Sequence, residues 1–247
     1  MEIEQIRKKL IELGNKERAE GSKRYLKSPY NFYGNKIPDL RAFSKEFKNL
    51  DFYSALNLAD ELWESGNHEE MWFALYVLTF KVKEKPIEVW QFMMKRLDKA
   101  KTWDLTDEMS SHILGPILAE KINLMSEIKQ LSESKNPWLR RISMVSTISL
   151  IRKNKIELTM RLAEKLVYDN DIYVQKGAGW MLREAGKKNR LSIREFILTH
   201  MDMKSQAFSY ATEKMIELRQ IKKDKVKEEK EKLKAEKIRI KKEKKNL

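Results

Sequence analysis

Cysteine is absent from the 247-residue chain, and histidine occurs only three times. The missing thiols exclude disulfide scaffolds, thiol nucleophiles, zinc fingers and iron-sulfur sites, and they are compatible with a reducing cytoplasm. His68, His112 and His200 are far apart, and none forms the His-x-x-x-His spacing that places two ligands on one helical face. We therefore expect no metal site and no cofactor.

Glycine and proline are also scarce, with 8 and 5 residues respectively. No segment shows sustained apolar/polar alternation, so the sequence predicts an all-helical protein essentially without strands. Long apolar runs are missing as well, because the most apolar stretch, residues 71–80, is too short to span a bilayer. The N-terminus is charged throughout and lacks the apolar region of a signal peptide. We expect a soluble, cytoplasmic protein that is not secreted and has no membrane partner.

Hydrophobic residues make up 41% of the chain and aromatic residues 9%, which is enough for a sizeable core. Lys and Arg outnumber Asp and Glu by 51 to 37, a formal net charge of +14. Residues 219–247 hold 14 Lys/Arg and 6 Asp/Glu, so +8 lies there and +6 on the body. We predict a folded domain, 1–218, and a basic helical or disordered tail, 219–247. The tail either keeps the protein soluble or tethers it to nucleic acid through phosphate neutralisation.

The spacing of apolar residues predicts a succession of helices. Their expected ranges are 2–24, 37–48, 51–65, 68–82, 86–98, 103–119, 123–133, 137–152, 155–168, 172–186, 191–201 and 204–218. Two kinds of start signal support them. They are prolines suited to the first turn, Pro38, Pro86 and Pro137, and N-caps, Thr102, Asn136 and Asp171.

A repeat underlies this helical pattern. His68, Thr102, Asn136 and Asp171 are equivalent starting points, separated by 34, 34 and 35 residues. Each unit holds two amphipathic helices that must stack on their neighbours to bury an apolar stripe. Tetratricopeptide repeats share the period, but their Trp, Gly, Tyr and Ala pattern is missing. We predict an all-α fold, a right-handed α-solenoid of HEAT-like repeats with a basic concave groove.

The repeat register brings polar residues of successive units together. Asp107 plus 34 gives Arg141, and Arg141 plus 35 gives Lys176. Trp103 and Trp180 lie one helical turn from Asp107 and Lys176, on the same helix faces. We therefore expect a carboxylate, a guanidinium and two indoles to converge.

The aspartates of this set also have structural interpretations. Asp104 falls in the first helical turn, where a carboxylate meets the positive end of the helix dipole. Asp107 lies deeper in the same helix, where capping does not explain it. It either forms a salt bridge to Arg141 between adjacent repeats or presents its carboxylate to an electropositive groove. Both interpretations stay open at this point.

Tryptophans at helical spacing are mostly core residues, and this applies to Trp63, Trp72 and Trp90, which stand among apolar neighbours. Trp180 differs because Gly177 and Gly179 precede it and Arg183 follows it. Such thinning of a helix suits either tight packing or a ligand. Arg140 and Arg141 point about 100° apart on their helix, so at most one faces the groove squarely, and the register favours Arg141.

Taken together, five segments resemble a known family. They are YLKSPYNFYGNKIPDLR at 25–41, WESGNHEEMWFALYVL at 63–78, TWDLTDEMSSHILG at 102–115, NPWLRRISMV at 136–145 and KGAGWMLREAGK at 176–187. Over about residues 2–215 the chain is similar to the AlkD-like alkylpurine DNA glycosylases, HEAT-repeat proteins of DNA alkylation repair. Thr102 stands where active members often carry a second tryptophan.

The resemblance implies a site made of Trp103, Asp107, Arg141 and Trp180. It implies a nucleoid-associated monomer that excises 7-methylguanine or 3-methyladenine from duplex DNA as a glycosylase of base excision repair. Asp107, Trp103 and Trp180 would be catalytic, and the expected DNA contacts are Arg141, Lys176, Arg183 and Arg140. Two alternatives remain: a noncatalytic binder of DNA structures with the same fold, and a protein-interaction scaffold.

Overall fold

The computed structural model describes residues 3–243, including their side chains except those at 238, 239 and 241–243. Position 2 of the first predicted helix and positions 244–247 of the predicted tail lie outside the described residues. In the described part, regular structure consists of helices, with one isolated bridge between Asn31 and Asn67. The prediction of an all-α fold is confirmed.

The α-helices follow one another along the chain with short connections. They are α1 (Ile3–Glu12), α2 (Lys16–Leu26), α3 (Ile37–Ser44), α4 (Phe52–Glu64), α5 (His68–Thr79), α6 (Pro86–Met94), α7 (Trp103–Met109), α8 (Gly115–Glu120), α9 (Met125–Ser132), α10 (Pro137–Val145), α11 (Ile148–Arg152), α12 (Glu157–Leu166), α13 (Ile172–Gly186), α14 (Arg190–Thr199), α15 (Ser205–Ala211) and α16 (Ile216–Glu243).

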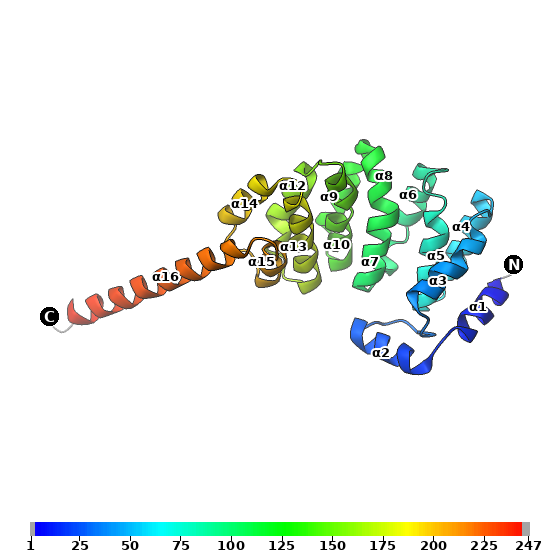
Figure 1. Ribbon diagram of the computed structural model, residues 1–247, viewed down its shortest axis with the longest axis horizontal. Coiled ribbons are helices and arrows are strands. Elements are labelled where there is room, and N and C mark those ends of the chain that lie inside the picture. Colours follow the sequence, from blue (N-terminus) through cyan, green and yellow to red (C-terminus); the bar gives the residue numbers. More distant parts are fainter. Residues whose placement is uncertain (1–2, 244–247) are drawn as a thin grey trace.

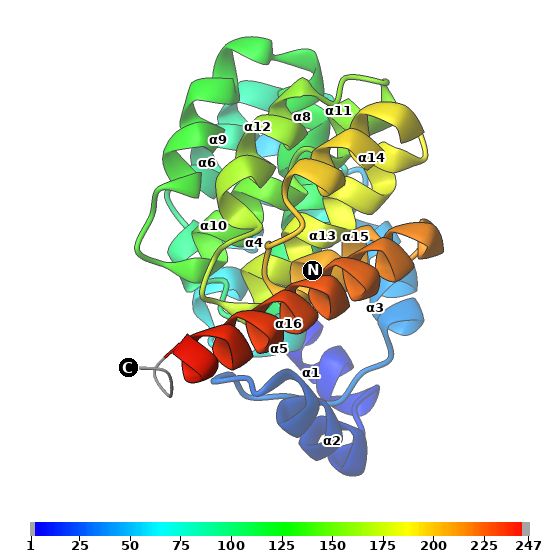
Figure 2. The same ribbon diagram turned by 90° about the vertical axis from the view of Figure 1, so that its left-hand side faces the viewer.

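The helices stack side by side along the long axis of the molecule, as Figure 1 shows. Helices α5, α7, α10, α13 and α15 contact one another in series. Figure 2, seen along this axis, shows α6, α8, α9, α12 and α14 in a tier above that series, and α1 and α2 below it. This arrangement confirms the predicted solenoid of HEAT-like repeats.

The repeat starts with similar local chemistry in each unit. Asn67, Asn136 and Asp171 are N-caps whose side chains accept hydrogen bonds from backbone N–H groups in the first turns of α5, α10 and α13. Such caps satisfy amides that otherwise lack an intrahelical partner. Thr102 occupies the equivalent position before α7, but its side chain makes no capping hydrogen bond. The predicted starts of α7, α10 and α13 are therefore correct to the residue.

The core runs through all repeats, and the three tryptophans predicted to be buried lie in it. Trp63 and Trp90 are 2% and 1% exposed, and Trp72 is 8% exposed. Each indole N–H has an acceptor: the Arg96 carbonyl for Trp63, Glu127 for Trp90 and Asp104 for Trp72. The core assignment of these tryptophans is confirmed.

Several predicted helices are divided in the structure. The range 2–24 breaks at Asn15, which caps the start of α2. The range 103–119 passes through a π-helical segment, Ser110–Leu114, between α7 and α8. A side chain on Gly115 would lie 2.7 Å from the Ser110 carbonyl oxygen and 2.9 Å from that of Ser146. Close approach of the next repeat therefore shapes this helix, which local apolar spacing does not encode.

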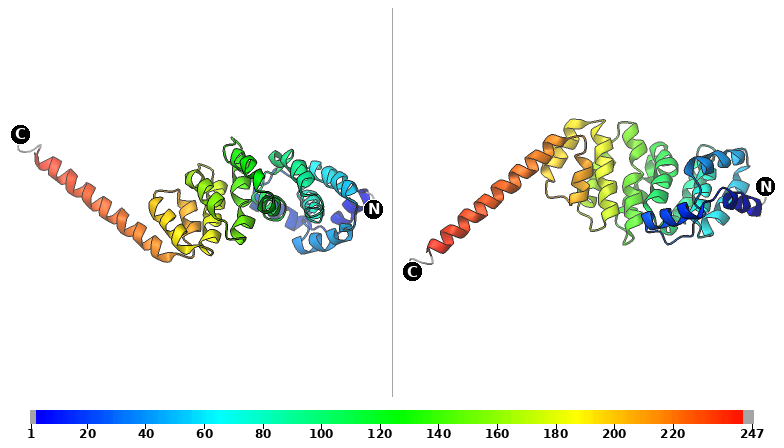
Figure 3. Two further views of the ribbon diagram at one scale, coloured as in Figure 1. Left: turned by 90° about the horizontal axis from the view of Figure 1, so that it is seen from above. Right: turned by 60° about the horizontal axis from the view of Figure 1, so that its bottom comes forward.

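The helix predicted over 204–218 is also divided, because α15 ends at Ala211 and α16 begins at Ile216. The expected boundary between body and tail at 218/219 thus falls inside the first turn of α16. Helix α16 continues to Glu243 and points away from the last repeat, as Figures 1 and 3 show. The division into a domain and a tail stays a prediction. Among the described residues, no helix is both long and apolar enough to cross a membrane.

Candidate functional site

Asp107 of α7 and Arg141 of α10 form a bidentate ion pair between adjacent repeats. Arg141 Nε donates to Asp107 Oδ1 at 2.8 Å, and Nη2 donates to Oδ2 at 2.7 Å. Arg141 Nη1 donates to the backbone carbonyl of Tyr173 at the start of α13, so the guanidinium ties three repeats together. The side chains of Asp107 and Arg141 are 17% and 6% exposed. The salt bridge between adjacent repeats, one of the two interpretations of Asp107, is thus present.

The same two side chains line a cavity of about 330 Å³. Its other lining residues are Trp103, Lys176 and Trp180, which the repeat register had grouped with them, and three tyrosines, Tyr25, Tyr173 and Tyr210. The predicted convergence of a carboxylate, a guanidinium and two indoles is therefore present, with an ammonium beside them. Because the carboxylate faces this cavity, the ion pair and the groove are one feature of the molecule.

The tyrosines are the part of the cavity that sequence reasoning missed. Tyr25 projects from α2, is 74% exposed and meets Trp103 edge-to-face with ring centroids 6.1 Å apart. Tyr173 follows the N-cap of α13 and lies next to Lys176, whose Nζ is 5.9 Å from the Tyr173 ring centroid. Of the three tyrosines, only Tyr173 could have been predicted from the sequence, since it stands one turn before Lys176 on the same face of the helix.

Asp104 has a different environment from Asp107, although both are on α7. Its Oδ2 accepts hydrogen bonds from His68 Nε2 at 2.9 Å and from the Trp72 indole at 3.2 Å. His68 in turn stacks on Phe32 with ring centroids 4.4 Å apart. Asp104 therefore anchors the first turn of α7 to α5 through side chains, beyond the expected interaction with the helix dipole.

The two carboxyl groups differ in acidity for this reason. Burial raises the pKa of Asp107, Arg141 counteracts the rise, and the nearby charge of Asp104 adds to it. Burial would also raise the pKa of Asp104, but hydrogen bonds from His68 and Trp72 outweigh it and bring this pKa below its ordinary value. The Asp107 charge thus depends on Arg141 for its compensation.

Gly177 and Gly179 leave two sides of α13 without a side chain, as tight packing requires. A side chain on Gly177 would lie 3.2 Å from Arg141 Nη1, so the glycine leaves room for the guanidinium. A side chain on Gly179 would lie 2.4 Å from the Ala207 carbonyl oxygen, so this glycine allows α15 to approach. The first glycine serves the ion pair and the second serves the wall that carries Tyr210.

The two remaining arginines of the predicted set lie outside the cavity lining. Arg140 donates to both carboxylate oxygens of Asp169, at 2.6 and 2.9 Å, and to the carbonyl of Ser134. Arg183 pairs with Glu184 and Glu213. The structure thus brings Trp103, Asp107, Arg141, Lys176 and Trp180 together and directs Arg140 and Arg183 to intramolecular partners.

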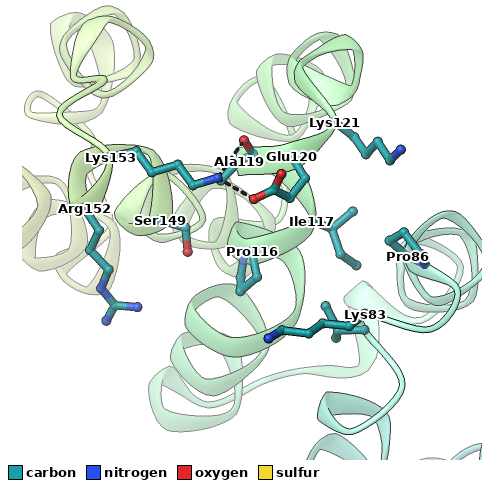
Figure 4. Close-up of a pocket in the computed structure, with 11 residues that line it drawn as sticks. Lys83, Pro86, Pro116, Ile117, Ala119, Glu120, Lys121, Ser149, Arg152 and Lys153 are labelled. Carbon is teal, nitrogen blue, oxygen red and sulfur yellow. Dashed lines mark hydrogen bonds and ion pairs between the residues drawn. The ribbon is translucent and has the colours of Figure 1, made fainter.

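A larger cavity, of about 630 Å³, lies at the ends of α8 and α11 (Figure 4). Its floor includes Pro116 and Ile117, and at its rim Lys153 bonds to Glu120. None of the predicted site residues lines it. Among the described residues, no three or more His, Asp or Glu side chains gather as metal ligands. The smaller cavity therefore holds the chemically richer set of side chains.

Residues 6–215 match a family model described as DNA alkylation repair enzyme. No curated protein matches the sequence. The fold is similar to that of a predicted DNA alkylation repair enzyme from Enterococcus faecalis, with a TM-score of 0.72, 20% identity and coverage of 82% of this chain and 96% of that one. AlkD2 from Streptococcus mutans aligns with a TM-score of 0.56, 20% identity and coverage of 72% and 89%. At these identities the structures show a shared fold. Because the family match spans all the repeats, the chain belongs to the DNA alkylation repair enzyme family.

Proposed function

We propose that the protein is a monofunctional DNA glycosylase of base excision repair, which hydrolyses the N-glycosidic bond of 7-methylguanine and 3-methyladenine in duplex DNA. It acts as a cytoplasmic monomer without a cofactor. The observation that carries this proposal is the Asp107 carboxylate, which Arg141 holds at the wall of a cavity shared with Trp103 and Trp180.

The substrate class follows from what the cavity offers. An N7- or N3-alkylated purine is already cationic and leaves as a neutral base, so its departure needs no strong general acid. Positive charge instead develops on the deoxyribose as the glycosidic bond stretches. A fixed carboxylate lowers the energy of this oxocarbenium-like state, since preorganised charge acts where charge develops. Asp107 is the carboxylate that lines the cavity.

The ion pair leaves Asp107 able to act in this way. A carboxylate has about four lone-pair positions, and Arg141 occupies one on each oxygen. One position on each oxygen is left for the sugar cation or for an attacking water, which the carboxylate orients. Arg141 fixes the plane of the carboxylate, so the group does not have to reorganise during the reaction.

The aromatic residues suit the same transition state. The faces of Trp103 and Trp180 attract a developing cation through their electron-rich rings. Tyr25 adds a further aromatic ring beside Trp103. We propose that the open cavity grips the sugar and backbone of the damaged nucleotide, without a deep pocket for the flipped base.

Among the basic residues, Lys176 is best placed to hold a phosphate beside the sugar, because it lines the cavity. Arg141 contributes through its hold on Asp107. Arg183 and Arg140 already pair with Glu213 and Asp169, so fewer of their N–H groups are left for DNA. We therefore rank these two arginines behind Lys176 as phosphate ligands.

Release of free base from duplex DNA carrying 7-methylguanine or 3-methyladenine tests the proposal. Asp107→Asn should lower the release rate at least about 100-fold, in the range found when a preorganised electrostatic contact is removed. Its DNA affinity should stay equal or rise, because a carboxylate near phosphates is lost. Asp39→Asn is the matched control, since Asp39 is exposed on α3 and removes the same charge away from the cavity. Full release by Asp107→Asn contradicts the assigned role.

A noncatalytic binder of DNA structures is the second candidate. It is favoured by the Asp107–Arg141 pair itself, whose bidentate geometry also makes sense as a structural link between repeats. This candidate predicts that the wild type binds duplex DNA yet releases no base above spontaneous depurination. The same assay with a parallel binding measurement therefore separates the two.

A further inference from the structure

Helix α16 is anchored at its root and exposed beyond it. Leu218 is fully buried, Arg219 donates to Thr212 Oγ1 at 3.0 Å, and the Lys222 ammonium lies 4.1 Å from the Phe208 ring centroid. From Lys223 on, the described side chains are exposed. A packed first turn supplies the nucleus that an isolated helix lacks. The rest of α16 thus projects from the last repeat as an ordered rod (Figures 1 and 3).

The exposed part of α16 has its charges sorted by face. About 100° separates successive residues on a helix, so five of the lysines between positions 223 and 237 fall within about 40° of one line. These five, Lys223, Lys227, Lys230, Lys234 and Lys237, are here named the lysine stripe. The acidic residues of the same segment stand about 80° or more from that line. They are Asp224, Glu228, Glu229, Glu231 and Glu236.

Most of the stripe lysines also lie next to one another in the structure. Lys223, Lys227, Lys230 and Lys234 line one shallow groove together with Val226 and Glu231, the acidic residue nearest to the stripe. At a rise of about 1.5 Å per residue, the stripe extends over about 21 Å. Duplex DNA carries one negative charge per about 1.7 Å of axis when both strands are counted, so an equal length of duplex carries about 12 phosphate charges.

Within the described part of the chain, the stripe lysines have no anionic partner. None of the five makes an ion pair or hydrogen bond with any described residue, whereas lysines of the body such as Lys153 and Lys165 pair with glutamates of neighbouring repeats. Consecutive stripe lysines are three or four positions apart, a like-charge spacing that weakens an isolated helix. A solubilising tail needs no such sorting, and an external polyanion would relieve the repulsion.

We propose that the lysine stripe of α16 binds the phosphate backbone of duplex DNA beyond the cavity site. The choice of duplex DNA as the polyanion rests on the proposed function. The stripe adds a contact that reads no sequence and no damage, because lysine–phosphate contacts carry no base information. It lengthens the footprint of the protein along the duplex and raises its affinity for undamaged DNA.

The apolar residues beside the stripe do not favour a lipid surface. Val226, Leu233 and Ile240 are 41%, 56% and 43% exposed and recur every seven residues. They form a single row at one edge of the stripe. A helix that lies in a membrane interface needs a broad apolar face opposite its charged one, and this row is too narrow for that.

Two double variants of the full-length protein test the proposal. Lys227→Gln/Lys234→Gln removes two charges from the stripe, and Lys225→Gln/Lys232→Gln removes two from the opposite face of the same helix. Both pairs are seven residues apart and change net charge equally. Binding to undamaged duplex DNA is measured as a function of salt concentration. Circular dichroism checks that the two variants keep the same helix content.

The stripe variant should reduce the slope of log affinity against log salt by about 1.8, since each lost phosphate contact contributes about 0.9. At 0.1 M salt this corresponds to a loss of affinity of up to about 60-fold. The opposite-face variant should keep the wild-type slope. Equal losses in both variants, or no loss in either, overturn the proposal. So does a stripe variant that binds DNA normally but no longer binds phosphatidylserine vesicles.

Failure here can be told from failure of the proposed function. Base release under saturating protein should be the same for the stripe variant as for the wild type, because the cavity is untouched. If the wild type releases no base, the glycosylase proposal fails while the comparison of salt slopes on undamaged duplex still stands.

Discussion

Replacement of Arg141 by methionine probes how much the candidate site depends on its ion pair. The change leaves the Asp107 carboxylate largely buried and unpaired. Breaking one partner of a buried pair costs about 3–5 kcal/mol. Because the Asp107 side chain keeps 17% exposure, we expect the lower end, about 3 kcal/mol. For a chain of this size that corresponds to a fall in Tm of about 6–12 °C.

The loss should depend on pH in a defined direction. Burial already raises the pKa of Asp107 with Arg141 present, and removal of the guanidinium raises it further. A carboxyl with a raised pKa in the folded state binds its proton more tightly there than in the unfolded chain. The cost of burying the charge is therefore largest at a pH above the raised pKa, and it shrinks as the pH falls through that pKa.

Urea denaturation of wild type and Arg141→Met at pH 7 and at about pH 5 measures this effect. The deficit in unfolding free energy should be smaller at the lower pH. In the double variant Asp107→Asn/Arg141→Met the buried charge is gone, so its unfolding free energy should lack the pH-dependent contribution of Asp107 that Arg141→Met enlarges. A deficit of Arg141→Met that is the same at both pH values would refute the reasoning.

Three further predictions concern packing, pH and the cavity rim. Gly179→Ala should destabilise the fold by about 1–3 kcal/mol in a thermal melt, because the new methyl group would lie 2.4 Å from a carbonyl oxygen of α15. Gly21→Ala in α2 is the control: its methyl group would have nothing within 4 Å, so the change should be neutral or stabilising. As the pH is lowered, base release should begin to fall at a pH above the ordinary pKa of an aspartate, because Asp107 must be ionised and burial raises its pKa. A release rate that stays unchanged down to pH 4 contradicts this. Tyr25→Ala should lower kcat/KM about 2- to 10-fold, which is the contribution of one aromatic contact. The Tm should not change, because Tyr25 is 74% exposed, and a lowered Tm would mean that Tyr25 supports the fold instead.

The repeat register was the most informative feature of the sequence. It placed Asp107, Arg141 and Lys176 in line across three units, and the structure joins the first two by hydrogen bonds and puts all three around one cavity. This works because solenoid repeats contact their neighbours in a constant geometry. A period of 34 to 35 residues therefore converts directly into spatial proximity.

Contacts outside the register could not be predicted in this way. Tyr25 comes from α2, which precedes the repeats and has no equivalent in them, so nothing in its spacing pointed to Trp103. Arg140 is one residue from Arg141, yet Asp169 of another repeat captures its guanidinium. The π-helical segment before Gly115 likewise depends on the backbone of the next repeat. In each case a long-range contact overrides the local pattern.

The ion pair and the proposed catalytic role of Asp107 support each other. A carboxylate this deeply buried would gain a proton without a compensating cation, and a protonated acid could not stabilise a sugar cation. Arg141 keeps the charge in place and consumes only part of its hydrogen-bonding capacity. Loss of Arg141 should therefore damage activity and stability together. Loss of Asp107 should lower base release at least about 100-fold, while Arg141 keeps its hydrogen bond to the Tyr173 carbonyl.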